Sequence, residues 1–110
     1  MPDLIMVDGQ GIAHPRRMGI ATHLGILTDI PTIGIAKSKL CGRYKIPDQK
    51  RGSMADLTDK GDHIGYVYRS RDNVKPIFIS SGHRVSLQTS IYFVEKYLNG
   101  LAESRFETGL

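Results

Sequence analysis

The residues with the clearest chemical potential lie near the amino terminus, where an apolar run ends in an aspartate. Leu4-Ile5-Met6-Val7 leads into Asp8, and Gly9-Gln10-Gly11 then allows the chain to turn sharply. Ligands and catalytic groups in open α/β sheets gather at the carboxyl ends of strands, where a carboxylate oxygen suits Mg²⁺. Asp8 is therefore a candidate metal ligand and catalytic residue; the structural alternative is an aspartate that only caps the turn.

Basic side chains follow this turn. His14-Pro15-Arg16-Arg17 stands where a helix is expected to begin, and helix amino termini attract anions. We expect His14 and Arg16 to contact a phosphate-bearing ligand, with a solvated helix end as the alternative for each arginine. The glycines do not form a dinucleotide fingerprint, because His14 replaces the third glycine and the next predicted strand ends in Lys37 instead of an acid.

Two later residues are candidates for the same site. Lys37 ends the strand predicted to neighbour the first, so its ammonium group would lie near Asp8 and stabilise charge on a phosphate. His83 follows Ser80-Ser81-Gly82 in a predicted turn between a strand and a helix, where it could transfer a proton or join a metal shell. The alternatives are an ordinary solvent-exposed lysine and a structural histidine.

The elements that must position these residues follow from the hydrophobic pattern. A strand over 4–8, a helix from Pro15 to about Thr28 and a strand over 32–37 predict a βαβ unit. Its two strands should be parallel, with a right-handed crossover.

The rest of the chain is expected to complete an α/β fold. Residues 38–62 are the least ordered by composition, and strands over 64–69 and 75–80 predict an antiparallel hairpin. The spacing of apolar residues indicates a final helix over about 86–98. The polar tail over 101–110 is expected to fray.

The bulk composition sets outer limits on function. A length of 110 residues suits one domain or part of one, and the net charge of +4 mildly favours a polyanionic partner. Cys41 is the only cysteine, so the chain has no internal disulfide and a cytoplasmic location is the simplest expectation. No apolar run approaches the roughly 20 residues that a membrane span needs.

Three segments of the sequence closely resemble the endonuclease V family. They are PDLIMVDGQGIAHPRR at 2–17, IPTIGIAKSKLCG at 30–42 and VKPIFISSGHR at 74–84. The resemblance covers nearly all of residues 2–98 and implies a partial RNase H-like fold, in which the hairpin and the final helix follow the βαβ unit. It further implies a Mg²⁺-dependent repair nuclease, with Mn²⁺ as a substitute, that hydrolyses the second phosphodiester bond 3′ to deoxyinosine in DNA, or acts on inosine in RNA.

The resemblance also implies roles for individual positions. Asp8 matches the family's strand-end metal ligand, and His14, Lys37 and His83 match residues around the active site. The positions near the pocket that receives the flipped base are Gly9, Gly11, Gly19, Ile20 and Leu40.

The sequence departs from the family in one respect that bears on activity. The family's active site also takes an aspartate and a glutamate from an amino-terminal half, whereas Asp56, Asp59 and Asp62 here fall in a distant loop. Residues 1–110 are therefore interpreted as the carboxyl-terminal portion of a single nuclease domain. Since one carboxylate holds Mg²⁺ weakly, we expect the isolated chain to be weakly active or inactive.

Three functional hypotheses follow from these features. The first is the nuclease, which would associate with itself or with a separately encoded amino-terminal half. The second is a non-catalytic remnant that binds nucleic acid, and the third is a nucleotide-binding α/β module that uses the turn from Gly9 to Arg17 as a phosphate cradle. The third lacks the lysine and Ser/Thr pair of a P-loop.

Overall fold

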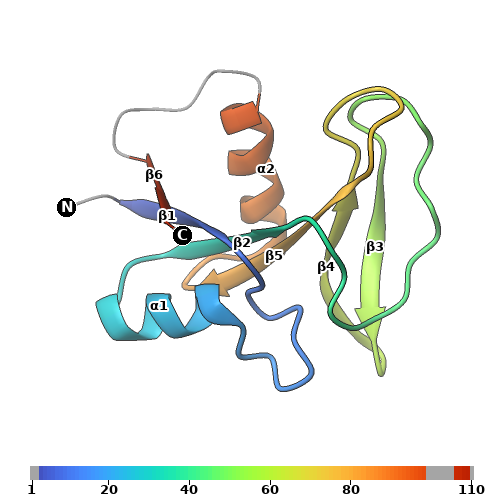
Figure 1. Ribbon diagram of the computed structural model, residues 1–110. Coiled ribbons are helices and arrows are strands. Elements are labelled where there is room, and N and C mark those ends of the chain that lie inside the picture. Colours follow the sequence, from blue (N-terminus) through green and yellow to red (C-terminus); the bar gives the residue numbers. More distant parts are fainter. Residues whose placement is uncertain (1–2, 99–105, 110) are drawn as a thin grey trace.

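One mixed β-sheet separates the two helices of the chain. The computed structural model, drawn in Figure 1, describes residues 3–98 and 106–109. The elements, in chain order, are β1 (Leu4–Asp8), α1 (Ile20–Thr28), β2 (Thr32–Ala36), β3 (Met54–Asp59), β4 (Asp62–Tyr68), β5 (Ile77–His83), α2 (Leu87–Leu98) and β6 (Phe106–Gly109). The sheet order is β3-β4-β5-β2-β1-β6, and Figure 1 shows α1 and α2 on opposite faces.

The predicted βαβ unit is confirmed. Strands β1 and β2 pair in parallel, with Asp8 opposite Ile35. Helix α1 packs on the sheet face that carries Thr32, whose hydroxyl donates a 2.7 Å hydrogen bond to the carbonyl of Ala21. The carboxyl ends of β1 and β2 therefore meet at one edge of the sheet.

The helix of this unit is shorter than predicted. It begins at Ile20 instead of Pro15, because Arg17 adopts a left-handed backbone conformation (φ 58°) that ends any continuous right-handed helix there. Residues 9–19, called here the glycine loop, instead cross the edge of the sheet before the helix starts. The expectation that His14 and Arg16 occupy a helix amino terminus is therefore wrong.

The hairpin of the second half is confirmed and is larger than predicted. Strands β4 and β5 pair antiparallel, but β5 continues to His83, and residues expected to be irregular form the edge strand β3. Strand β3 was missed because its half-exposed sequence, Met-Ala-Asp-Leu-Thr-Asp, carries little β-branched or aromatic content.

The apolar core lies in two parts, one on each face of the sheet. One cluster joins Met6, Ile33 and Ile79 to Ile91 and Val94 of α2, and the other surrounds Val67 and Phe78 on the opposite face. None of the described helices is long and apolar enough to span a membrane.

The tail differs from the expectation of a frayed end. Residues 106–109 form β6, which pairs in parallel with β1 on the side opposite β2. Residues 101–105 and 110 lie outside the described part of the chain.

Candidate active site

Asp8 and Lys37 lie at the same edge of the sheet, as the sequence predicted. Asp8 is the last residue of β1 and pairs with Ile35, while Lys37 directly follows β2. Both residues are exposed. Among the described side chains neither has an ion-pair partner, so a carboxylate and an ammonium group are both available to a ligand at this edge.

The glycine loop folds back over the end of β2. The Gly9 amide donates to the carbonyl of Ile35 (2.9 Å), and the Gln10 side chain donates to the carbonyl of Ser38 (2.9 Å). A Cβ atom at Gly34 would lie 2.5 Å from the Gly11 nitrogen and 2.7 Å from the Gly9 oxygen. Glycine at position 34 is therefore what lets the backbone of the loop rest against the strand.

The loop is anchored to β5 as well. The Gly11 amide donates to the Ser80 hydroxyl (2.9 Å), and the Ile12 amide donates to the carbonyl of Ser81 (2.8 Å). These hydrogen bonds thus hold the glycine loop against both β2 and β5.

Four of the positions implied for the base pocket come together here. A Cβ atom at Gly9 would meet the Ile20 side chain, and the Gly19 amide donates to the carbonyl of Gly11 (2.9 Å). Ile20 is 53% exposed, so it presents an apolar surface beside the glycine backbone. Leu40, also implied for this pocket, is 54% exposed in the segment that follows β2.

His14 is fixed in orientation by its own loop. The backbone amide of Arg16 donates to Nδ1 of His14 (3.0 Å), which leaves Nε2 as the ring nitrogen available to a ligand. The Arg16 side chain is exposed. Both residues thus belong to the glycine loop itself, without a helix amino terminus beneath them.

Arg17 ties this loop to the turn between β3 and β4. Its guanidinium donates to the carbonyl of His14 (2.9 Å) and forms ion pairs with Asp59 (3.1 Å) and Asp62 (3.0 Å). The hydrogen bond to Asp62, followed by that to Asp59, raises the pKa of Arg17 above its usual value. Sequence reasoning missed this clamp because its partners are 42 and 45 residues away along the chain.

His83 lies at the other end of β2. It pairs with Thr32 at the amino end of that strand, whereas Asp8 is opposite Ile35 near the carboxyl end. Its Nε2 atom is 3.0 Å from Asp29, and Arg84 is 3.1 Å from the second oxygen of the same carboxylate. The structure therefore does not bring His83 to Asp8 and Lys37, because β5 runs antiparallel to β2 and carries it away from their edge.

The described residues do not form a complete metal-binding cluster. They contain no cluster of three or more His, Cys, Asp or Glu side chains that could hold a metal ion. Asp8 offers a single carboxylate at the edge where a hard cation would meet a phosphate. The donor set described here does not fit a complete Mg²⁺ centre.

Comparison with known proteins agrees with this geometry. The mixed sheet defines an α/β fold, and its structural neighbours are endonuclease V structures, which have an RNase H-like fold. The family model for endonuclease V matches residues 1–103. The chain belongs to the endonuclease V family.

Solved structures support the same assignment. The chain is similar to endonuclease V from Streptomyces avermitilis, with 49% identity and a TM-score of 0.74 over 79% of this chain and 38% of that one. The Bacillus subtilis endonuclease V is 36% identical, with a TM-score of 0.82 over 86% of this chain and 41% of that one.

A third structure contains nucleic acid. The Ciona intestinalis endonuclease V, in complex with DNA that contains an inosine followed by a ribo-adenosine, is 31% identical to this chain. Its TM-score is 0.67 over 86% of this chain and 46% of that one. The chain spans less than half the length of each of these three structures.

Proposed function

We propose that this chain is the part of a deoxyinosine-directed nuclease that holds the modified nucleotide and one carboxylate of the hydrolytic centre. The reaction would be Mg²⁺-dependent hydrolysis of the second phosphodiester bond 3′ to the deoxyinosine, with Mn²⁺ as a substitute metal. The observation that carries the proposal is the joint placement of Asp8, Lys37 and the glycine loop at one edge of the sheet.

Each group has a role that its geometry supports. Gly9 would lie against an extruded base, with Ile20 as an apolar contact beside it, while Gly11, hydrogen-bonded to Ser80 and Gly19, would hold the loop in shape. Extruding a base costs a few kcal/mol, and less at a mismatched pair, which favours deoxyinosine. Lys37 would stabilise the negative charge that develops on the phosphate, since an exposed ammonium group needs no rearrangement to do so.

The proposed activity requires a metal ion and further ligands from a second polypeptide. Asp8 would contribute one ligand, and the remaining ligands would come from outside the described residues. A separately supplied amino-terminal half, or a second copy of the chain, would then raise the activity of a chain that is weakly active alone. A cytoplasmic location remains the prediction from cysteine content.

A paired cleavage and binding assay tests the proposal. The purified chain is incubated with duplex DNA that carries one central deoxyinosine, or adenosine in its place, with Mg²⁺ or with a chelator. We expect selective binding of the deoxyinosine duplex and slow Mg²⁺-dependent nicking, which Asp8→Ala removes while binding is retained.

The other outcomes separate the competing hypotheses. Selective binding without nicking, unchanged in Asp8→Ala, would identify a non-catalytic binding remnant. Equal binding of the two duplexes would overturn deoxyinosine recognition, and tight binding of a free mononucleotide would favour the nucleotide-binding module.

A further inference from the structure

The turn between β3 and β4 holds a lysine in an unfavourable backbone conformation. Lys60 and Gly61, the two central residues, both have positive φ angles (52° and 86°), as in a type I′ turn. Such turns prefer Asn-Gly, because asparagine tolerates the left-handed region better than a long side chain does. Local stability therefore does not explain a lysine at position 60.

Two backbone hydrogen bonds to Thr58 of β3 place Arg43 beside the same turn. Its amide donates to the carbonyl of Thr58 (2.7 Å), and the Thr58 amide donates to the carbonyl of Arg43 (3.0 Å). Arg43, Thr58 and Lys60 line one open hollow of about 520 Å³, together with Asp59 and Gly61. Arg43 and Lys60 thus contribute to the lining of the same hollow.

The two acidic residues near this hollow share one arginine. Asp59 and Asp62, on either side of the turn, are both engaged by Arg17. Neither Arg43 nor Lys60 forms an ion pair with any side chain that the structure describes. Arg17, Arg43 and Lys60 together carry three positive charges against the two carboxylates, so this region has a net charge of +1.

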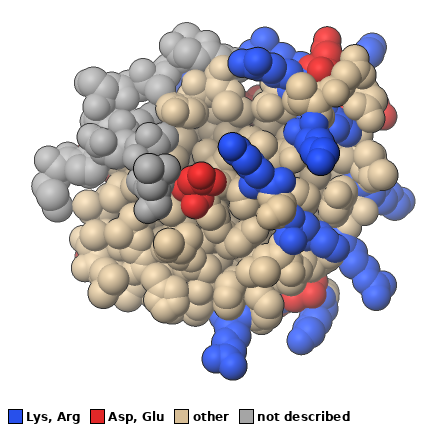
Figure 2. All heavy atoms as spheres, viewed as in Figure 1, with Lys and Arg blue, Asp and Glu red and all other residues tan. Residues whose placement is uncertain are grey.

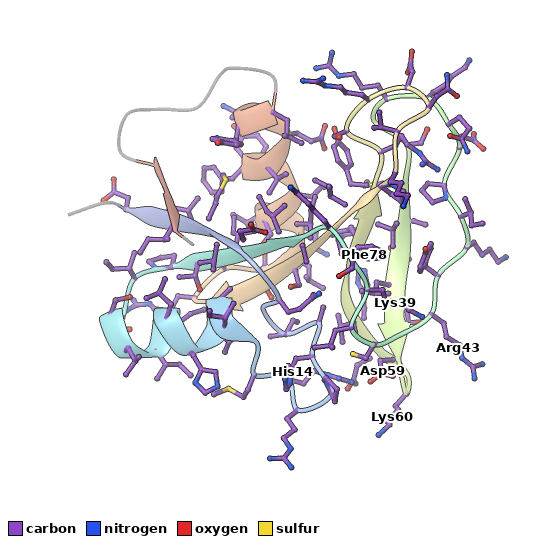
Figure 3. The ribbon with its side chains drawn as sticks, viewed as in Figure 1. His14, Lys39, Arg43, Asp59, Lys60 and Phe78 are labelled. Carbon is purple, nitrogen blue, oxygen red and sulfur yellow. The ribbon has the colours of Figure 1, made fainter. Side chains whose placement is uncertain are left out.

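The hollow adjoins the candidate active site. Arg17 joins the carbonyl of His14 to Asp59, so the glycine loop and the β3–β4 turn are neighbours, and Figure 3 shows His14, Asp59 and Lys60 along the same edge. Lys39, whose ammonium donates to the carbonyl of Gly42, lies between the loop and the turn. Figure 2 shows that Lys and Arg side chains gather over the half of the molecule that holds β3 and β4.

We infer that Arg43 and Lys60 bind the phosphate backbone of duplex DNA in the flank of the modified nucleotide. This inference rests on the proposed function, since it takes the glycine loop as the place where the deoxyinosine is held. The β3–β4 turn is then a second point of attachment, which holds the duplex in register with the loop and reads no sequence.

Salt-dependent binding tests the inference. The double variant Arg43→Gln/Lys60→Asn is compared with wild type by fluorescence anisotropy on a long deoxyinosine duplex and on one of about a single helical turn. Each lost phosphate contact should reduce the slope of log K against log salt by roughly 0.9, so the double variant should lose about two. Affinity at low salt should fall roughly tenfold on the long duplex and by a smaller factor on the short one, which offers fewer flanking phosphates.

The control is Arg71→Gln/Lys75→Gln, which removes the same charge from the loop between β4 and β5, at the far end of the hairpin from the turn. It should leave the slope near that of wild type. Because Asn-Gly suits a type I′ turn, Lys60→Asn alone should keep or raise the melting temperature while it weakens binding. If Lys60 had only a structural role, Lys60→Asn would change the melting temperature without weakening DNA binding.

Two results would overturn the inference. One is an equal loss of slope in the variant and the control, which would indicate a diffuse effect of net charge. The other is an unchanged slope in the Arg43/Lys60 variant. Equal binding of deoxyinosine and undamaged duplexes by wild type would instead contradict the proposed function, and the slope comparison on undamaged DNA would still decide the role of the turn.

Discussion

The two ends of strand β2 carry similar charged groups in opposite arrangements. At the amino end, His83 and Arg84 both contact the carboxylate of Asp29. At the carboxyl end, Asp8 and Lys37 are exposed and have no ion-pair partner among the described side chains. The amino end satisfies its charges internally, whereas the carboxyl end leaves them for something that binds.

This difference decides between two histidine-bearing candidates that look alike in sequence. His83 directly follows Gly82 and His14 comes three residues after Gly11, each shortly after a predicted strand. His14 has one ring nitrogen facing away from its own loop, and His83 has its Nε2 atom on Asp29. Only His14 belongs to the loop that directly follows Asp8.

The largest contrast between the ends should appear in metal binding. We expect Mn²⁺ to broaden the amide NMR signals of Asp8 and Gly9 in the wild-type chain, and to leave those of Asp29 and His83 sharp. Asp8→Asn should abolish the broadening, because an amide is a far weaker ligand for a hard cation than a carboxylate. His83→Gln, the matched control, should preserve it.

The same variants should separate in residual nicking. Asp8→Asn should lower the rate by about a hundredfold or more, and Lys37→Ala by a smaller factor, since each removes charge aimed at the reacting phosphate. His83→Gln should leave the rate close to that of wild type. A loss of nicking in His83→Gln as large as that in Asp8→Asn would show that the comparison of the two ends does not predict function.

Gly34 lies against the glycine loop, and Gly25 lies against Thr32 and His83 at the amino end of β2. An added Cβ at Gly34 would press on the backbone of the glycine loop, and one at Gly25 would lie 2.7 Å from the Thr32 hydroxyl oxygen and 2.9 Å from the His83 ring. Overpacking typically costs about 1–3 kcal/mol, so Gly34→Ala and Gly25→Ala should both lower the free energy of unfolding in urea.

Only one of these variants should change recognition. Gly34→Ala must shift the loop that carries Gly9 and Gly11, so its preference for deoxyinosine over undamaged duplex should fall. Gly25→Ala should keep that preference, because its clash lies at the His83 end. Equal preferences in the two variants would contradict the assignment of the glycine loop to base binding.

Local sequence was sufficient to predict part of this arrangement. The apolar runs before Asp8 and Lys37 predicted two parallel strands, and the structure confirms that these residues share an edge. The start of α1 could not be predicted, because the left-handed conformation of Arg17 accompanies ion pairs with residues that are distant in sequence. The position of His83 depends on β5 continuing through Ser81 and Gly82, which are buried although their types do not favour a strand.

The smallest expected effect concerns pH and the paired end. The hydrogen bond from His83, with that from Arg84, holds the pKa of Asp29 below its ordinary value of 3.8. A carboxylate whose pKa is lowered by folding stabilises the folded chain at pH values above its ordinary pKa. This contribution is lost as the pH falls through the lowered pKa.

The melting temperature of wild type should therefore fall more steeply below about pH 4 than that of Asp29→Asn. The difference should be modest, because the Asp29 side chain is 70% exposed and solvent screens its ion pairs. An equally steep fall of the melting temperature in Asp29→Asn would contradict this stabilising role of the Asp29 carboxylate.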